Sequence, residues 1–257
     1  MPVKKSIRKN ERTVVTVISV SAVLVIWQCV SVAMNIPVIF PSPVTVVKSF
    51  TEILFRKNFV TDVLFTVLRA FESFIVIVLS GTVTGILAGY FRIVEFALNP
   101  LMYIFKATPV MSVILLAFIW FRTGTVPVFS AFLMAFPVMY VQVLNGVRGL
   151  DEQLVQMCDV YNIRGWKRLR HFTVPALIPS IITGARQSLS MIWKVVIAAE
   201  VLTLPSHGVG RSMQLAQIQL ETEKVFAWTA VAVLLTVTGD FLFDTAIRKI
   251  TQRRIGK

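Results

Sequence analysis

Long apolar stretches separated by short polar connections run along most of the chain. A helix needs about 20 mostly apolar residues to cross roughly 30 Å of hydrocarbon, and several stretches are long enough. We therefore expect an all-α integral membrane protein, a single transmembrane domain over residues 1–257. The pattern predicts six membrane-spanning helices, at about 13–34, 63–90, 100–121, 126–147, 177–203 and 225–247.

The third and fourth predicted helices contain helix-breaking signals. Pro109 and Pro127 interrupt this part of the chain, and Lys106 lies within the third helix. Proline is tolerated in membrane helices when neighbouring groups satisfy the freed backbone atoms, so we retain both helices.

Two connections are longer than the others. Residues 35–62 carry Pro41 and Pro43, and Ser42 is placed to begin a short helix on the membrane surface. Residues 150–173 form the longest polar segment between predicted spans. We call this second segment the 150–173 loop.

Composition excludes an ordinary soluble domain. Hydrophobic residues make up 56% of the chain and charged residues 15%, whereas a soluble domain has about 25% charged residues. The mean hydropathy is +0.75. The apolar run at 13–34 is longer than the core of a signal peptide, so we expect a retained first helix.

The formal net charge of +13 follows the membrane topology rather than a nucleic-acid partner. Positively charged residues concentrate in cytoplasmic segments of membrane proteins. Here they gather in the basic tail 1–12, in the 150–173 loop and at the C-terminus. With an even number of spans, both termini and this loop are expected in the cytoplasm.

No catalytic chemistry is apparent. The chain lacks the G-x-x-x-x-G-K-[ST] pattern that binds nucleotide phosphates. Cys29 and Cys158 lie far apart, and the histidines are His171 and His207, so no disulfide or metal-ligand spacing appears. We expect no catalytic residue, metal or cofactor. The chain itself is therefore not expected to hydrolyse a nucleotide by that route.

The first half of the 150–173 loop has the pattern of a short helix. Asp151 suits the N-cap, and Leu154, Met157 and Tyr161 form an apolar stripe at helical spacing. Asn162 can end the helix in a left-handed conformation. A basic segment, 164–172, follows. Two interpretations remain equally open: a docking element for a partner, or a loop held on lipid headgroups by its basic residues.

The same loop resembles the signature segment of permeases from binding-protein-dependent ABC importers. That family pattern runs Glu-Ala-Ala, three residues, Gly, then twelve residues to a proline. Here Gln156-Met157-Cys158 takes the Glu-Ala-Ala place, Asn162 the glycine place and Pro175 the proline place. The spacing and proline match; the other named residues differ, and Gln156 removes a charge. Glu200, Gly208-Val209-Gly210 and Gly239-Asp240 also resemble the family.

Pro41-Ser42-Pro43 and the region around Arg69 resemble the subfamily that imports nitrate, sulfonates, taurine and thiamine-precursor pyrimidines. The likeness covers roughly 35–247. It implies the type I (MetI-like) importer fold in the bacterial inner membrane and a pathway between two permease copies. It also implies two ATP-binding subunits and an extracytoplasmic solute-binding protein. The residues that it implies for coupling to the ATPase are Leu154, Gln156, Met157, Cys158, Tyr161, Asn162, Arg164 and Pro175.

Small residues recur every four positions in the second span. Gly81, Gly85 and Gly89 allow a neighbouring helix to approach closely. Ordinary packing is the favoured interpretation over a sliding seam in the transport pathway. Met111 and Ser112 are candidates to line that pathway.

Charged residues within spans are costly and are usually paired. Arg69 and Glu72, three residues apart, are expected to pair on one helix face. Glu200 and Asp240 are expected in interhelical pairs or near helix ends. The rival interpretation makes these acids a proton relay in an ion- or proton-coupled carrier without an ATPase. A membrane scaffold that transports nothing is a second rival. The sequence does not identify a substrate.

Overall fold

The computed structural model describes residues 9–36 and 38–255, and throughout this part the regular structure is helical. This confirms the all-α class. The helices are α1 (Lys9–Met34), α2 (Pro43–Leu54), α3 (Phe59–Tyr90), α4 (Arg92–Ala107), α5 (Val110–Trp120), α6 (Val126–Arg148), α7 (Glu152–Val160), α8 (Gly165–Arg168), α9 (Val174–Thr203), α10 (Val209–Ile218) and α11 (Thr222–Ile255). A π-helical turn, Leu169–Thr173, joins α8 to α9.

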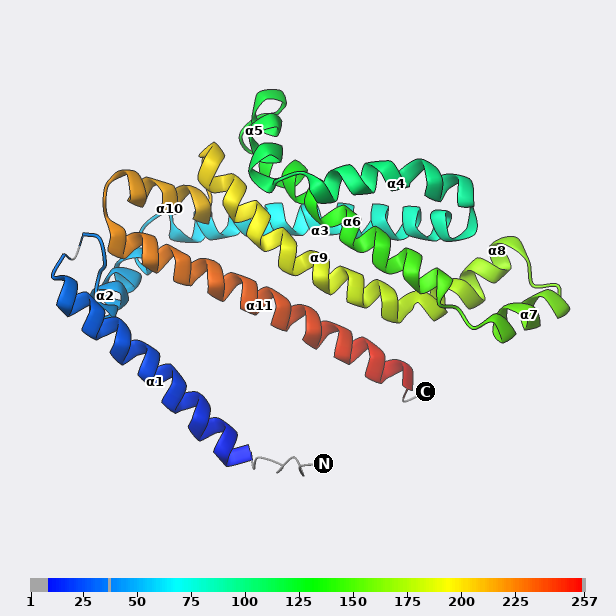
Figure 1. The fold of residues 1–257 in the computed structure, drawn as a ribbon, viewed down its shortest axis with the longest axis horizontal. Helices are drawn as coiled ribbons and strands as arrows, with labels where there is room; N and C mark the ends of the chain where they lie inside the picture. The colour runs from blue at the N-terminus through cyan, green and yellow to red at the C-terminus, as the bar shows by residue number, and fades with distance from the viewer. Residues whose placement is uncertain (1–8, 37, 256–257) are drawn as a thin grey trace.

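The long helices run roughly lengthwise through the molecule, with short helices at its two ends (Figure 1). Helices α7 and α8 project at one end, which we call the loop end. Helices α2 and α10 lie at the other, which we call the α10 end. The start of α1 and the end of α11 both point toward the loop end.

Four helices in the described residues are long and apolar enough to cross a membrane: Val14–Met34, Phe59–Tyr90, Val126–Arg148 and Thr222–Lys249. They correspond to the first, second, fourth and sixth predicted spans. Helix α9, with 30 residues, covers the fifth, although it carries Arg186, Lys194 and Glu200 among its apolar residues.

The third predicted span, 100–121, is not one helix. Helix α4 already begins at Arg92, and α4 and α5 meet at an angle of 104°. The cause is Pro109, which lacks an N–H group and disfavours helical geometry in the residue before it. Thr108 accordingly has an extended conformation, with ψ of 126°. Helix α5 therefore runs in a different direction from α4 (Figure 1), and it packs against α6 and α9 through the buried Ile114 and Ala117.

Helices α3, α6 and α9 form the centre of the bundle, and the glycines of α3 lie in the contact between α3 and α6. A Cβ atom at Gly81 would lie 2.6 Å from Met139 Cγ, and one at Gly85 would lie 2.8 Å from Val143 Cβ. At Gly89 the nearest atom would be Val147 Cγ1 at 2.5 Å. The two helices therefore approach so closely that a side chain at any of these three positions would have to displace atoms of α6.

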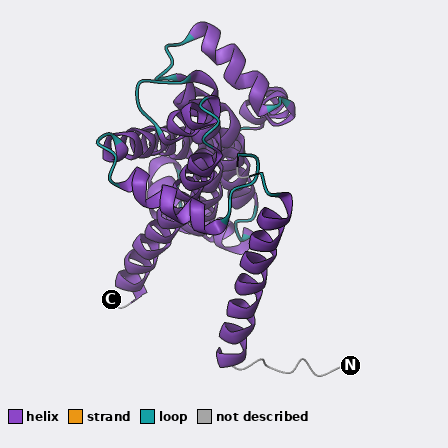
Figure 2. Ribbon diagram, turned by 90° about the vertical axis from the view of Figure 1, so that its left-hand side faces the viewer, coloured by secondary structure: helices purple, strands orange, loops and turns teal. Residues whose placement is uncertain are grey.

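Helix α1 stands apart from this centre (Figure 2). Its residues from Val14 to Ile26 are exposed. It is attached near the α10 end, where Trp27 Nε1 donates to the Pro41 carbonyl at 3.0 Å and Ser31 Oγ to the Phe40 carbonyl at 3.1 Å. Almost the whole length of α1 is thus left for lipid or another chain to cover.

Candidate functional site

The 150–173 loop contains a helix whose two ends are fixed by its own sequence. At its start, the Asp151 carboxylate accepts a hydrogen bond from the Gln153 N–H at 2.8 Å. At its end, Asn162 is left-handed, with φ of 54°. The Ile163 N–H then donates to the Cys158 carbonyl at 2.8 Å, and the Asn162 N–H to the Asp159 carbonyl at 3.1 Å. These two bonds form a Schellman cap, so α7 is a well-defined short helix.

The apolar face of α7 is not covered by the rest of the described chain. Leu154 is 45% exposed, Met157 46% and Tyr161 72%. Gln156 is exposed as well, while Cys158 is only 1% exposed and packs inward. A helix with three large uncovered apolar side chains in a row, projecting at the loop end (Figure 1), has the character of a docking surface.

The loop is joined firmly to the bundle. Arg168 Nη1 lies 2.9 Å from Asp159 Oδ1, which ties α8 to α7. The hydroxyl groups of Tyr90 and Thr173 are hydrogen-bonded, which ties the end of α3 to the π-helical turn. That turn runs directly into α9, with Pro175 in the first turn. Helix α7 is therefore connected to α9 and α3 through α8 and the π-helical turn.

A buried polar network lies near the α10 end. Glu200 on α9 is fully buried, and its carboxylate accepts from Arg69 Nη1 at 2.6 Å and from Thr66 Oγ1 at 2.8 Å, both on α3. The Gly210 N–H donates to the same carboxylate at 3.0 Å. Arg69 also donates to the His207 carbonyl at 2.8 Å. The charge of Glu200 is thus compensated by donors from α3 and α10.

A second buried acid, Asp62, extends this network. Ser212 Oγ donates to its carboxylate at 2.8 Å, and the Gly208 N–H and His207 Nδ1 lie 3.3 Å from it. The Val209 N–H donates to Thr66 Oγ1 at 2.9 Å. Three successive backbone N–H groups at the start of α10 are therefore satisfied by side chains of α3 and α9. Such groups at a helix N-terminus favour negative partners, and the result is that α10 is fastened to the bundle.

One prediction for this region is wrong: Arg69 pairs with Glu200 on α9 and not with Glu72, which is exposed. Helix α10, which begins at Val209, was not predicted.

The network also contains Asp62, Thr66 and His207, none of which was among the candidate residues. Asp62 in the first turn of a span was the one signal that a buried partner lay nearby.

The other candidate residues occupy separate places. Asp240 Oδ2 accepts from Ser190 at 2.9 Å, whereas its buried Oδ1 has no partner among the described residues. Met111 and Ser112 are exposed at the start of α5. Among the described residues, Asp240 and Glu200 have different hydrogen-bond partners: Ser190 for Asp240, and Thr66, Arg69 and the Gly210 N–H for Glu200.

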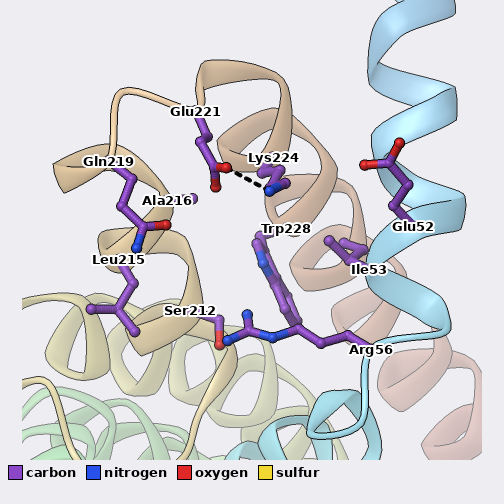
Figure 3. Close-up of a pocket in the computed structure, with 10 residues that line it drawn as sticks. All are labelled: Glu52, Ile53, Arg56, Ser212, Leu215, Ala216, Gln219, Glu221, Lys224 and Trp228. Carbon is purple, nitrogen blue, oxygen red and sulfur yellow. Dashed lines mark hydrogen bonds and ion pairs between the residues drawn. The ribbon is translucent and has the colours of Figure 1, made fainter.

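A polar cavity of about 420 Å³ lies at the α10 end, between α2, α10 and α11. Figure 3 shows Arg56 extending beneath Trp228 toward Ser212, with the ion pair of Lys224 and Glu221 (2.6 Å) above. The cavity thus presents groups of both charges on the face opposite to α7.

Comparison with known proteins agrees with this geometry. Residues 81–256 match the family model described as "Binding-protein-dependent transport system inner membrane component". The chain is 28% identical over 235 residues to the putative aliphatic sulfonates transport permease protein SsuC of Bacillus subtilis, covering 91% of this chain and 83% of the relative.

It is 25% identical over 242 residues to the taurine transport system permease protein TauC of Escherichia coli, covering 91% and 86%. It is also 25% identical over 223 residues to the riboflavin transport system permease protein RibX of Chloroflexus aurantiacus, covering 86% and 83%.

Proposed function

The chain belongs to the binding-protein-dependent transport system inner membrane component family, and on this basis we propose that it is driven by a separate ATP-binding subunit docked on α7. It is an ABC transporter permease and not an enzyme. In this proposal it forms the solute pathway of an importer, while ATP hydrolysis takes place in the partner.

The observation that supports docking most strongly is the uncovered apolar face of α7. Leu154, Met157 and Tyr161 are each 45–72% exposed on a helix that is capped at both ends. Covering each of them with a partner surface contributes on the order of 1 kcal/mol. A preformed helix adds affinity because little backbone order is lost on binding. The partner would thus meet a rigid apolar face.

The connections of the loop support a route for coupling. The π-helical turn continues into α9, and Tyr90 and Thr173 link the same turn to α3. Closure of the ATP-binding subunits would then shift α7, α9 and α3 together and change which end of the pathway is open. The rival carrier has less support, because Glu200 is held by Arg69, Thr66 and the Gly210 N–H rather than left available for a transported ion.

The assembly follows from the same proposal. Two copies of the chain, as a homodimer, would enclose the pathway, with one ATP-binding subunit on each α7 and an extracytoplasmic solute-binding protein at the α10 end. Both termini and the loop end would face the cytoplasm, as the distribution of lysine and arginine favours. The membrane is the bacterial inner membrane, consistent with the family.

For the substrate we propose a small anion of the sulfonate type, such as taurine. The support is the names of two relatives, for aliphatic sulfonates and for taurine. A flavin-like heterocycle is the second candidate, because a third relative is named for riboflavin. The two candidate substrates are distinguished by measuring the uptake of labelled taurine and of labelled riboflavin in cells with and without this chain. Chain-dependent riboflavin uptake without taurine uptake would reverse the choice.

Met157→Glu tests docking on α7. A charge placed in the middle of the apolar face must be desolvated on binding, so we expect the affinity for the ATP-binding subunit to fall about tenfold or more. The measurement is co-purification from native membranes in mild detergent, together with ATP-driven uptake in proteoliposomes.

Ile218→Glu is the matched control. Ile218 is 61% exposed at the α10 end, so the same charge is added far from α7, and the ATP-binding subunit should be retained as in the unmodified chain. If Met157→Glu and Ile218→Glu retain the ATP-binding subunit equally well, and ATP-driven uptake is intact in both, then α7 is not part of the docking surface.

A further inference from the structure

A second cavity lies behind the 150–173 loop, where the end of α3 meets α7 and α8. Its volume is about 410 Å³. One wall is apolar and comes from the end of α3 and the residue after it, and the other comes from the loop. The residues that matter below are Leu87, Tyr90 and Phe91 on the first wall and Asp159, Arg164 and Arg168 on the second.

The apolar wall continues along α3 toward the middle of the span. Leu79 is 63% exposed, Val83 56% and Leu87 42%, and these residues recur every four positions on one face of α3. Because α3 is one of the helices apolar enough to cross a membrane, this stripe faces either hydrocarbon or another membrane helix. An acyl chain can follow it from the bilayer into the cavity.

The loop wall carries positive charge that the described chain does not neutralise. Arg164 is exposed and forms no ion pair among the described residues. Arg168 uses Nη1 to pair with Asp159 at 2.9 Å, while its buried Nε has no hydrogen-bond partner in the described part of the chain. The Asp159 carboxylate is thus compensated, and donors from two guanidinium groups remain for an anion.

We propose that this cavity binds an anionic phospholipid. The phosphate group lies against Arg164 and the partly exposed guanidinium group of Arg168, and an acyl chain lies along Leu87 and Val83. The position suits a lipid, because the cavity sits where α3 ends and headgroups begin. Trp166 beside it is 70% exposed, as is typical of aromatic residues at a membrane surface. Basic pockets at the cytoplasmic ends of membrane helices are the usual sites for acidic headgroups.

An acidic side chain of the ATP-binding subunit is the competing occupant. It accounts for the arginines but not for the apolar stripe, which runs from the cavity along α3 away from the loop end. A peripheral subunit does not reach that far into a span. The lipid proposal needs only that α3 crosses the bilayer, and it is independent of docking on α7.

The test uses the full chain, purified in detergent, stripped of lipid and titrated with phosphatidylglycerol while native mass spectrometry counts bound lipid. One arginine near an anionic headgroup contributes about 1 kcal/mol, so Arg164→Gln should weaken binding about fivefold. Leu87→Trp, which fills the apolar wall without changing charge, should also reduce binding.

Arg170→Gln is the matched control, because Arg170 is an exposed arginine of the same loop that does not line the cavity. It should bind phosphatidylglycerol like the unmodified chain. Phosphatidylcholine and inorganic phosphate should bind weakly. Their binding should be the same in the unmodified chain and in the Arg164→Gln variant.

Equal losses in the Arg164 and Arg170 variants, or equal binding of phosphatidylcholine and phosphatidylglycerol, would overturn the proposal. So would a dependence on Arg164 seen with inorganic phosphate alone. If Arg164→Gln leaves lipid binding in the titration unchanged but reduces capture of the ATP-binding subunit in a separate co-purification from native membranes, the cavity belongs to the protein partner. Because no ATP-binding subunit is present in the titration, its failure leaves the test of Met157 unaffected.

Discussion

Replacing Glu200 by alanine is expected to destabilise the protein by about 3–5 kcal/mol, because it leaves a buried charge without its partner. Arg69 would keep its guanidinium in the bundle with only the His207 carbonyl as an acceptor. The Gly210 N–H and Thr66 hydroxyl would lose their acceptor as well. The measurement is thermal unfolding in detergent. The folded fraction at each temperature is the amount of monodisperse protein that remains in size-exclusion chromatography.

Glu72→Ala is the control for this experiment. This variant also removes one carboxylate, from α3. Because Glu72 is exposed, the free energy of unfolding should change by no more than about 0.5 kcal/mol. Replacing both Arg69 and Glu200 by methionine should recover part of the loss, since no uncompensated charge then remains. If Glu200→Ala unfolds at the same temperature as Glu72→Ala, the buried pair does not stabilise the bundle.

Gly85→Ala should also have a large effect, because it separates the two helices at the centre of the bundle. The new Cβ atom would lie 2.8 Å from Val143 Cβ and 3.0 Å from the Tyr140 carbonyl oxygen. The second contact is with backbone, which cannot rotate away. Overpacking of this kind costs about 1–3 kcal/mol, and the same unfolding measurement detects it.

Two further variants make the test specific. At Gly124 a new Cβ atom would meet nothing within 4 Å, so Gly124→Ala should leave stability nearly unchanged. Val143→Gly removes both side-chain atoms that the new methyl group would meet, Cβ at 2.8 Å and Cγ1 at 2.9 Å. Combined with Gly85→Ala, it should therefore cost less stability than the sum of the two single variants. Equal stability of the Gly85 and Gly124 variants would contradict the close approach of α3 and α6.

The spans were predictable because hydrophobic length is a strong local signal. The break between α4 and α5 was not predicted, although Pro109 was recognised as a helix-breaking residue. A proline inside an apolar run is compatible with a mild kink when neighbours satisfy the backbone, and with a sharp turn when they do not. Only the packing of α5 against α6 decides between these outcomes.

The ends of α7 were predictable from single residues, since Asp151 and Asn162 act on the backbone next to them. The network at the α10 end was not. Arg69 and Glu200 are 131 positions apart, and periodicity within one helix suggested the nearer acid, Glu72. Helix α10 was missed because Pro205 and Gly208 precede it and Gly210 lies in its first turn, and such residues usually indicate a turn.

Photo-crosslinking from α7 in native membranes tests the central claim most directly. A photoreactive phenylalanine analogue at Tyr161, which is 72% exposed at the loop end, is compared with the same analogue at Phe55, which is 90% exposed and follows α2 near the α10 end. We predict a covalent adduct between position 161 and an ATP-binding subunit, and none from position 55. Adducts from position 161 with lipid alone, or equal yields of the subunit from both positions, would contradict docking on α7.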